Sequence, residues 1–202
     1  MKNYSRRKFI KKSGVSAVAS LAASTMLSSS CDDNFSTPNS KGEYMGGFSA
    51  PKMNKIKAAF IGVGSRGTQH AYNFKGFQDT EIVSICDLYK NRVENLNKKL
   101  DLSIDGYWGE ENAWVKMVEE RRPDIVFIST NWDNHAPMAI RCMELGSHVF
   151  VEVPLANTIE DLWKIVDTSE KTQKHCMMLE NVNYGREELM FLNICRQGII
   201  GE

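Results

Sequence analysis

The sequence predicts an α/β fold built on a doubly wound parallel sheet, and three features of residues 55–202 support this prediction. Short apolar runs alternate with segments of helical period, which is the pattern of consecutive βαβ units. A glycine-rich turn follows the first apolar run at Gly62, and the second run ends in an acidic residue, Asp87. Because βαβ connections are right-handed, we expect helices on both faces of the sheet.

The expected strands are short and rich in apolar residues, as strands buried on both faces are. They cover residues 55–64, 80–87, 124–130, 148–153 and 175–181. The expected helices lie between and after the strands and have apolar residues at helical spacing. They cover residues 68–77, 88–100, 111–122, 136–146, 158–172 and 186–198.

Local signals mark several helix ends. Thr158, with Asp161 three residues later, resembles a capping box, which fixes a helix start. Pro137 near the start of 136–146 and Gly146 at its end match the usual asymmetry of helix termini.

The glycine-rich turn has the full G-x-G-x-x-G spacing of a dinucleotide-binding loop. It reads Gly62-Val63-Gly64-Ser65-Arg66-Gly67, after an expected strand and before an expected helix, as the motif requires. Gly62 permits a tight turn, Gly64 lets the backbone approach a pyrophosphate, and Gly67 lets helix and strand pack closely. The helix N-terminus then offers free N–H groups to the phosphates. The sequence therefore predicts a Rossmann-type nucleotide-binding domain.

Asp87 ends the second expected strand, 20 residues after Gly67. A carboxylate at this point accepts hydrogen bonds from ribose hydroxyls and repels a 2′-phosphate, so NAD is favoured over NADP. Lys90 and Arg92 lie a few residues on and weaken that preference. The alternative role for Asp87 is a helix N-cap or a turn former.

Ligands of open α/β sheets bind beyond the carboxyl ends of the strands, which directs attention to two further segments. Residues 129–135 follow one strand, and Glu152 to Pro154 follow the next. Trp132 is a candidate to pack on the nicotinamide or adenine ring, or else shields the core. His135 is a candidate to hydrogen-bond cofactor or substrate, or else caps a helix.

Composition excludes several other classes. The 25 basic and 25 acidic residues balance, so no basic excess points to nucleic acid. No apolar run reaches the 18 residues that indicate a spanning helix. The cysteines lack metal-ligand spacing, so we expect no metal site.

Residues 1–31 are interpreted as a targeting leader rather than as part of the fold. The order "SRRKFIK" resembles a twin-arginine export signal, with a Sec signal or a basic helix as the alternatives. "MLSSSC" resembles a lipoprotein site with Cys31 as the acylated residue, which implies an exported, periplasmic or membrane-anchored protein. Residues 32–54 are expected to form a flexible linker.

The glycine loop, the Thr/Ser-x-x-x-x-His loop and the Glu-x-Pro strand end, in this order, resemble the Gfo/Idh/MocA family. That resemblance implies a Rossmann domain over 55–185 and the start of a truncated α/β substrate domain over 186–202. Dehydrogenases of the family usually have Glu-Lys-Pro, in which the Lys serves the reacting hydroxyl. Here Val153 stands in that place and exchanges no proton.

A more specific resemblance is to glycoside hydrolase family 109, the NAD-dependent α-N-acetylgalactosaminidases. It is carried by "GVGSRGTQH", "ICD", "NWDNHAPM", "EVP" and residues 170–202. It implies a sugar substrate and implies Tyr184 as a tentative catalytic residue, whose alternative is packing at a turn. The residues that it implies as NAD contacts, beside Gly62, Gly64 and Gly67, are Ser65, Arg66, Asp87, Trp132, Asp133, Asn134, His135, Glu152, Val153 and Asn181.

The activity implied by this resemblance is cleavage of α-N-acetylgalactosaminides by transient C3 oxidation, elimination, water addition and re-reduction. Family members are about twice as long, so this chain alone is expected to be inactive, with an exposed apolar face that favours association. The alternatives are a sugar or polyol dehydrogenase of the Gfo/Idh/MocA family and a non-catalytic fragment.

Overall fold

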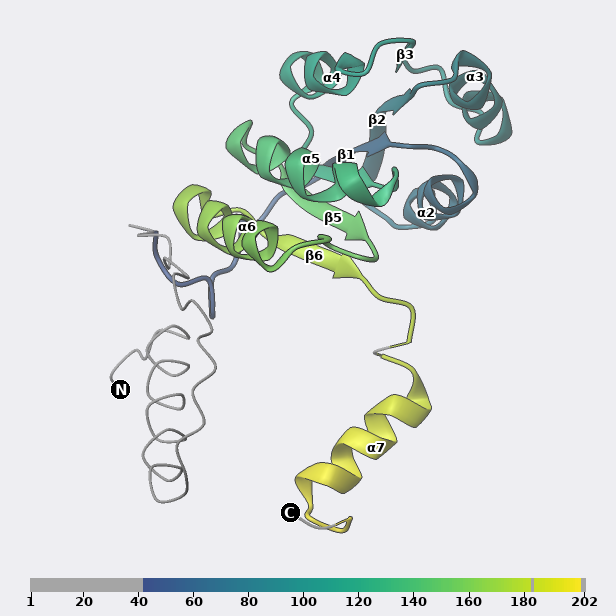
Figure 1. The fold of residues 1–202 in the computed structure, drawn as a ribbon. Helices are drawn as coiled ribbons and strands as arrows, with labels where there is room; N and C mark the ends of the chain where they lie inside the picture. Colours follow the sequence, from purple (N-terminus) through teal and green to yellow (C-terminus); the bar gives the residue numbers. More distant parts are fainter. Residues whose placement is uncertain (1–41, 183, 201–202) are drawn as a thin grey trace, which may run out of the picture.

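The computed structural model describes residues 42–182 and 184–200, and these form a parallel α/β sheet domain followed by a separate helix (Figure 1). Six strands pair in the order β3-β2-β1-β4-β5-β6, and every pairing is parallel. The strands are β1 (Ile56–Ile61), β2 (Thr80–Asp87), β3 (Gly106–Trp108), β4 (Ile125–Ile128), β5 (His148–Glu152) and β6 (Cys176–Leu179). This is the order of a dinucleotide-binding Rossmann sheet, so the predicted fold class is confirmed.

Helices cover the two faces of the sheet, as the predicted right-handed connections require. They are α2 (Ser65–Lys75), α3 (Lys90–Lys99), α4 (Ala113–Arg121), α5 (Trp132–Glu144) and α6 (Ile159–Thr172). One buried cluster joins α4, α5 and α6 to one face, and a second joins α2 and α3 to the other. Side chains alternate between these clusters along β1, where Ala58 and Phe60 face α2 while Ala59 and Ile61 face α5.

Several predicted helix ends are confirmed. Thr158 accepts a hydrogen bond from the backbone N–H of Asp161, which caps α6. Gly146 has φ +99° and follows α5, where its N–H and that of Ser147 bond to Met143 and Cys142 carbonyls. This is a Schellman ending, and it requires the left-handed conformation that glycine adopts without strain.

Two helix starts and one strand differ from prediction. Helix α2 begins at Ser65 rather than after the glycine motif, and α5 begins at Trp132 rather than at residue 136. Pro137 therefore lies inside α5 rather than in its first turn, where a missing N–H costs nothing. Strand β3 was not predicted, because its three residues form no apolar run.

The chain before β1 is described from residue 42. Residues 42–55 contain no helix or strand, but they touch the domain. The Gln173 side chain donates to the carbonyl of Glu43, and the ring of Phe48 lies 5.0 Å from that of His175. The predicted leader, Cys31 and the first part of the predicted linker lie outside the described residues. No helix in the described part of the chain has the length and apolar character that crossing a bilayer requires.

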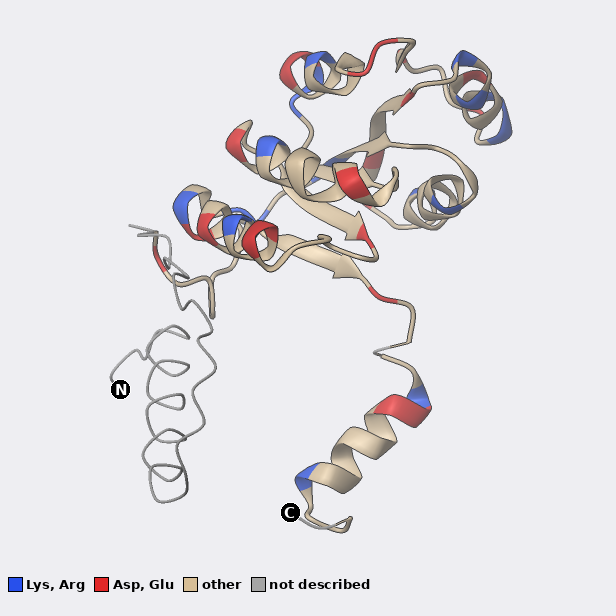
Figure 2. Cartoon of the chain, viewed as in Figure 1, with Lys and Arg blue, Asp and Glu red and all other residues tan. Residues whose placement is uncertain are grey.

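The last helix, α7 (Arg186–Arg196), lies apart from the sheet (Figure 1). None of its residues is buried, and its charged residues stand near its two ends (Figure 2). Its middle exposes the apolar side chains Leu189, Met190, Phe191 and Leu192, each between 45% and 59% exposed. The described chain therefore presents the apolar surface that the sequence predicts.

Candidate cofactor site

The glycine-rich loop connects β1 to α2, and two of its glycines are required by their surroundings. Gly62 has φ +80°, and a Cβ there would lie 2.5 Å from the carbonyl oxygen of Ser129. A Cβ on Gly67 would collide with the carbonyl oxygen of Gly62. The loop thus folds tightly against the end of β4 and against the first turn of α2.

Gly64 is different, because a Cβ there would point into open space rather than against protein. The nearest atom to a Cβ there would be Nη1 of Arg92, 3.9 Å away. Gly64 is also the N-cap of α2, and no side chain caps this helix. The loop therefore leaves a backbone surface and a helix N-terminus open to a ligand, which fits a dinucleotide diphosphate.

Asp87 lies at the end of β2 beside this loop and is 7% exposed. Its Oδ2 accepts from the Val63 N–H at 2.8 Å, and its Oδ1 accepts from the Tyr89 N–H at 3.0 Å. Arg92 approaches Oδ1 at 3.5 Å and stacks over the Tyr89 ring at 4.7 Å. Because a carboxylate has about four acceptor positions, Asp87 can brace the loop and still accept from a ribose hydroxyl.

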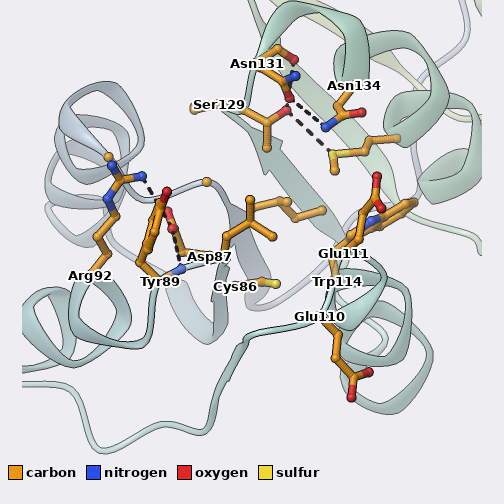
Figure 3. A pocket seen from close by; sticks show the side chains of 16 residues that line it. Cys86, Asp87, Tyr89, Arg92, Glu110, Glu111, Trp114, Ser129, Asn131 and Asn134 are labelled. Carbon is orange, nitrogen blue, oxygen red and sulfur yellow. Dashed lines mark hydrogen bonds and ion pairs between the residues drawn. The ribbon is translucent and has the colours of Figure 1, made fainter.

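A cavity of about 540 Å³ opens between Asp87 and the loop that follows β4 (Figure 3). This volume falls within the range of small-molecule sites. Asp87, Tyr89 and Arg92 line one side, and Ser129 and Asn134 line another (Figure 3). The Ser129 hydroxyl is buried and has no hydrogen-bond partner in the described structure. Such an atom at a cavity wall is a group that a ligand could satisfy.

The cavity also contains a thiol that takes no part in polar chemistry. Burial, reinforced by the charge of Asp87, raises the pKa of the Cys86 thiol to about 12. Cys86 therefore stays protonated at neutral pH and serves as an apolar wall. Among the described residues, no three His, Cys, Asp or Glu side chains gather closely enough to hold a metal ion.

The first turn of α5 supplies the predicted Trp-Asp-Asn-His segment, and its members point in different directions. Asn134 lines the cavity and donates to the Asn131 side chain at 2.6 Å. Neither Trp132 nor Asp133 lines the cavity. Trp132 is 63% exposed, and the Asp133 carboxylate accepts from the Asn157 side chain. Only Asn134 of these three lines the cavity directly.

His135 is buried beneath this segment. Its Nδ1 lies 2.7 Å from the Pro154 carbonyl oxygen and its Nε2 lies 3.2 Å from that of Thr130. The ring therefore ties the loop after β4 to the loop after β5 and does not line the cavity. Its predicted contact with NAD stays a prediction, and its role in this structure is support of the two loops.

A second polar cluster lies on the other side of the glycine loop and unites three predicted residues. Glu152, at the end of β5, is 7% exposed, and its Oε1 accepts from Nε of Arg66 at 3.2 Å. Arg66 also donates to the Asn181 side chain at 2.5 Å. His70, which was not predicted, lies 2.6 Å from the same Glu152 oxygen. Its signal was its position four residues after Arg66, which places both on one helix face.

The remaining predicted residues lie outside these two groups. Ser65 is exposed in the first turn of α2. Val153 is half-buried, and its N–H donates to Oε2 of Glu152 at 3.3 Å. Tyr184 is 78% exposed on the segment that joins β6 to α7. The described residues therefore give a cofactor site in two parts, with no catalytic group assembled around Tyr184.

Comparison with known proteins agrees with this geometry. The model of the GFO_IDH_MocA oxidoreductase family, described as an NAD-binding Rossmann fold, matches residues 56–180. A glycosyl hydrolase family 109 protein of Akkermansia muciniphila is 45% identical, with 98% of this chain and 45% of the relative aligned. An alpha-N-acetylgalactosaminidase of Shewanella oneidensis is 44% identical, with 100% of this chain and 45% of the relative aligned. The chain thus spans just under half the length of these relatives.

Solved structures show the same fold. An NAD-binding protein from Listeria innocua is 28% identical with a TM-score of 0.61, over 73% of this chain and 42% of that one. The apo scyllo-inositol dehydrogenase from Lactobacillus casei is 20% identical with a TM-score of 0.65, over 74% and 43% of the two chains.

Proposed function

Because this chain belongs to the Gfo/Idh/MocA oxidoreductase family and is an NAD-binding Rossmann domain, we propose that it forms the cofactor-binding part of a glycosidase. The proposed substrates are α-N-acetylgalactosaminides. The observation that supports this choice is the 44% identity to the alpha-N-acetylgalactosaminidase of Shewanella oneidensis along the whole chain. The activity is proposed for a polypeptide with a substrate domain, since this chain aligns with 45% of that relative.

When bound, NAD supplies reversible hydride exchange at the sugar C3, which acidifies the C2 proton and lets the C1 substituent leave by elimination. The protein binds and orients. The open backbone at Gly64 and the first turn of α2 would receive the diphosphate, and Asp87 would receive a ribose on the cavity side. Glu152, held by Arg66, lies on the opposite side of the loop, where the second half of the dinucleotide would extend.

Val153 distinguishes this proposal from ordinary dehydrogenase chemistry. By the family resemblance its position is that of the Lys that serves the reacting hydroxyl, and a Val side chain neither donates nor accepts a proton. A paired carboxylate mechanism of the usual glycosidase kind is also not required by redox-assisted elimination. Tyr184 remains the proposed base or sugar contact on this chain.

A chimaera tests the proposal. Residues 55–202 of this chain would replace the aligned part of the Shewanella oneidensis relative, and the product would be assayed with an aryl α-N-acetylgalactosaminide in deuterated water. We expect aryl release with deuterium at C2 of the sugar and no net formation of NADH. The same chimaera with Asp87→Arg is expected to lose NAD affinity and activity together.

Three outcomes contradict the proposal. Accumulation of NADH with an oxidised sugar would support the sugar or polyol dehydrogenase alternative. NAD binding without any turnover would support the non-catalytic alternative. Unchanged NAD affinity in Asp87→Arg, measured by calorimetry on the 202-residue chain, would refute the assignment of the cavity to the cofactor.

We also propose that the leader directs export of the folded protein, with Cys31 as a lipid anchor. A protein that acquires NAD in the cytoplasm must cross the membrane folded, which the twin-arginine route permits. Replacing Arg6 and Arg7 with Lys should retain the protein inside the cell. Replacing Lys11 and Lys12 with Arg is the control and should leave export unchanged. Cys31→Ser should release the exported protein from the membrane fraction, and unchanged fractionation would contradict the anchor.

A further inference from the structure

We infer that His70 is a positioning residue of the cofactor site, which aims the carboxylate of Glu152 at the bound dinucleotide. The inference rests on the part of the proposed function that places NAD over the glycine loop, and it is independent of the sugar substrate.

Three donors surround the Glu152 carboxylate. His70 and Arg66 both approach Oε1, at 2.6 Å and 3.2 Å, and the N–H of Val153 donates to Oε2 at 3.3 Å. A carboxylate has about four acceptor positions, so one position remains, and it lies on Oε2. Fixing Oε1 through two side chains fixes where Oε2 points. A hydroxyl of the cofactor is the kind of donor that the remaining position accepts.

His70 is the more rigid of the two holders. The His70 side chain is 17% exposed and that of Arg66 is 51% exposed. The ring of His70 also lies over that of Phe127, with centroids 6.1 Å apart and planes 27° apart. A long exposed side chain loses much conformational entropy when it is held in one geometry, so exposed ion pairs contribute little. Orientation of Glu152 therefore depends more on His70 than on Arg66.

To hold Glu152, residue 70 needs a hydrogen-bond donor at the position of Nε2, and it does not need an aromatic ring. A buried carboxylate is costly unless it is hydrogen-bonded, and Nε2–H supplies one short bond to it. The amide nitrogen of Gln stands the same number of bonds from the backbone as Nε2 of His. His70→Gln should therefore keep Glu152 in place, whereas His70→Leu, which offers no donor, should release it.

The experiment measures NAD affinity of the 202-residue chain by calorimetry, beside thermal unfolding of each variant. We expect His70→Leu to weaken NAD binding about tenfold, the effect of losing one charge-assisted hydrogen bond, and His70→Gln to bind as the parent does. Gln69→Leu is the matched control, because among the described residues the Gln69 amide bonds only to Asn73, along the exposed face of α2. It should leave NAD affinity unchanged.

A cycle with Glu152→Ala separates positioning from simple packing. If His70 acts through Glu152, His70→Leu should weaken binding no further in the Glu152→Ala background, where no acceptor remains for His70. An equal loss in both backgrounds, or an equal loss in His70→Gln and His70→Leu, would overturn the inference. His70→Met replaces the Leu variant if that variant does not fold. Absence of NAD binding by the parent chain would instead refute the cofactor site itself, and the inference with it.

Discussion

The two halves of the sheet differ in how fully they are packed. Around β1, β2 and β4, α2 and α3 cover one face while α4 and α5 cover the other, and most of the strand side chains are buried. On β6, at the far edge, Met177 and Met178 are exposed, and α7 buries none of its apolar residues. The first half is held by contacts within the chain, and residues of this chain line the cavity beside Asp87 there. The second half leaves apolar area in water, which favours any further surface that covers it.

The largest expected effect lies in the packed half. Gly67→Ala should destabilise the domain by about 3 kcal/mol or more, because the new Cβ would collide with the Gly62 backbone, which has no room to move. Urea unfolding followed by circular dichroism measures the change. Retention of the parent's unfolding midpoint would show that the β1–α2 turn is looser than the structure indicates.

Gly64→Ala is the matched change in the same loop. Its Cβ would face open space, so the free energy of unfolding should change by at most about 1 kcal/mol, the scale of an N-cap effect. NAD affinity should nevertheless fall at least about tenfold, since crowding a close contact costs about 1–3 kcal/mol. Calorimetry on the folded variant checks this. Unchanged affinity would mean that the diphosphate does not approach the backbone at Gly64.

The same contrast explains what the sequence could predict. The strands other than β3, the tight turn at Gly62, the close packing at Gly67 and the capping of α6 depend on neighbouring residues, so local patterns were enough to predict them. Strand β3 was missed because its place is set by pairing with β2 rather than by its own three residues. The partners of His135 include the carbonyl of Pro154, 19 residues away, and no local pattern could predict that this ring links the loop after β4 to the loop after β5.

In the less packed half, the exposed face of α7 should drive self-association of this chain. Phe191→Glu should weaken that association about tenfold, because it removes a large apolar side chain from the surface that association would bury. Sedimentation velocity at several protein concentrations measures the effect. Phe77→Glu is the control, since Phe77 is 66% exposed, against 59% for Phe191, but lies on the α2–β2 turn of the packed half. Equal effects of Phe191→Glu and Phe77→Glu would show that self-association does not depend on the exposed face of α7.

The smallest expected effect is pH-dependent and lies at the opposite end of β5 from Glu152. Burial, together with the charges of Lys174 and His175, lowers the pKa of His148 below its usual 6.5, while Asp124 opposes the shift. Its Nδ1 accepts from the His175 N–H at 2.9 Å, which a protonated ring could not do. Below pH 6.5 the unfolded chain therefore binds a proton that the folded chain resists, so stability falls as the pH falls through this window and is unaffected above it.

His148→Asn isolates this contribution, because the Asn side-chain oxygen can replace Nδ1 as the acceptor but does not titrate. The free energy of unfolding in urea, compared at about pH 5.5 and about pH 7.5, should drop less in the variant than in the parent. NAD affinity at the higher pH should be the same in both, since His148 starts β5 while the cofactor site lies at the carboxyl ends of the strands. An identical pH dependence in the two proteins would show that the Nδ1 contact does not hold the edge of the sheet, and a changed affinity would show that the two ends of β5 are coupled.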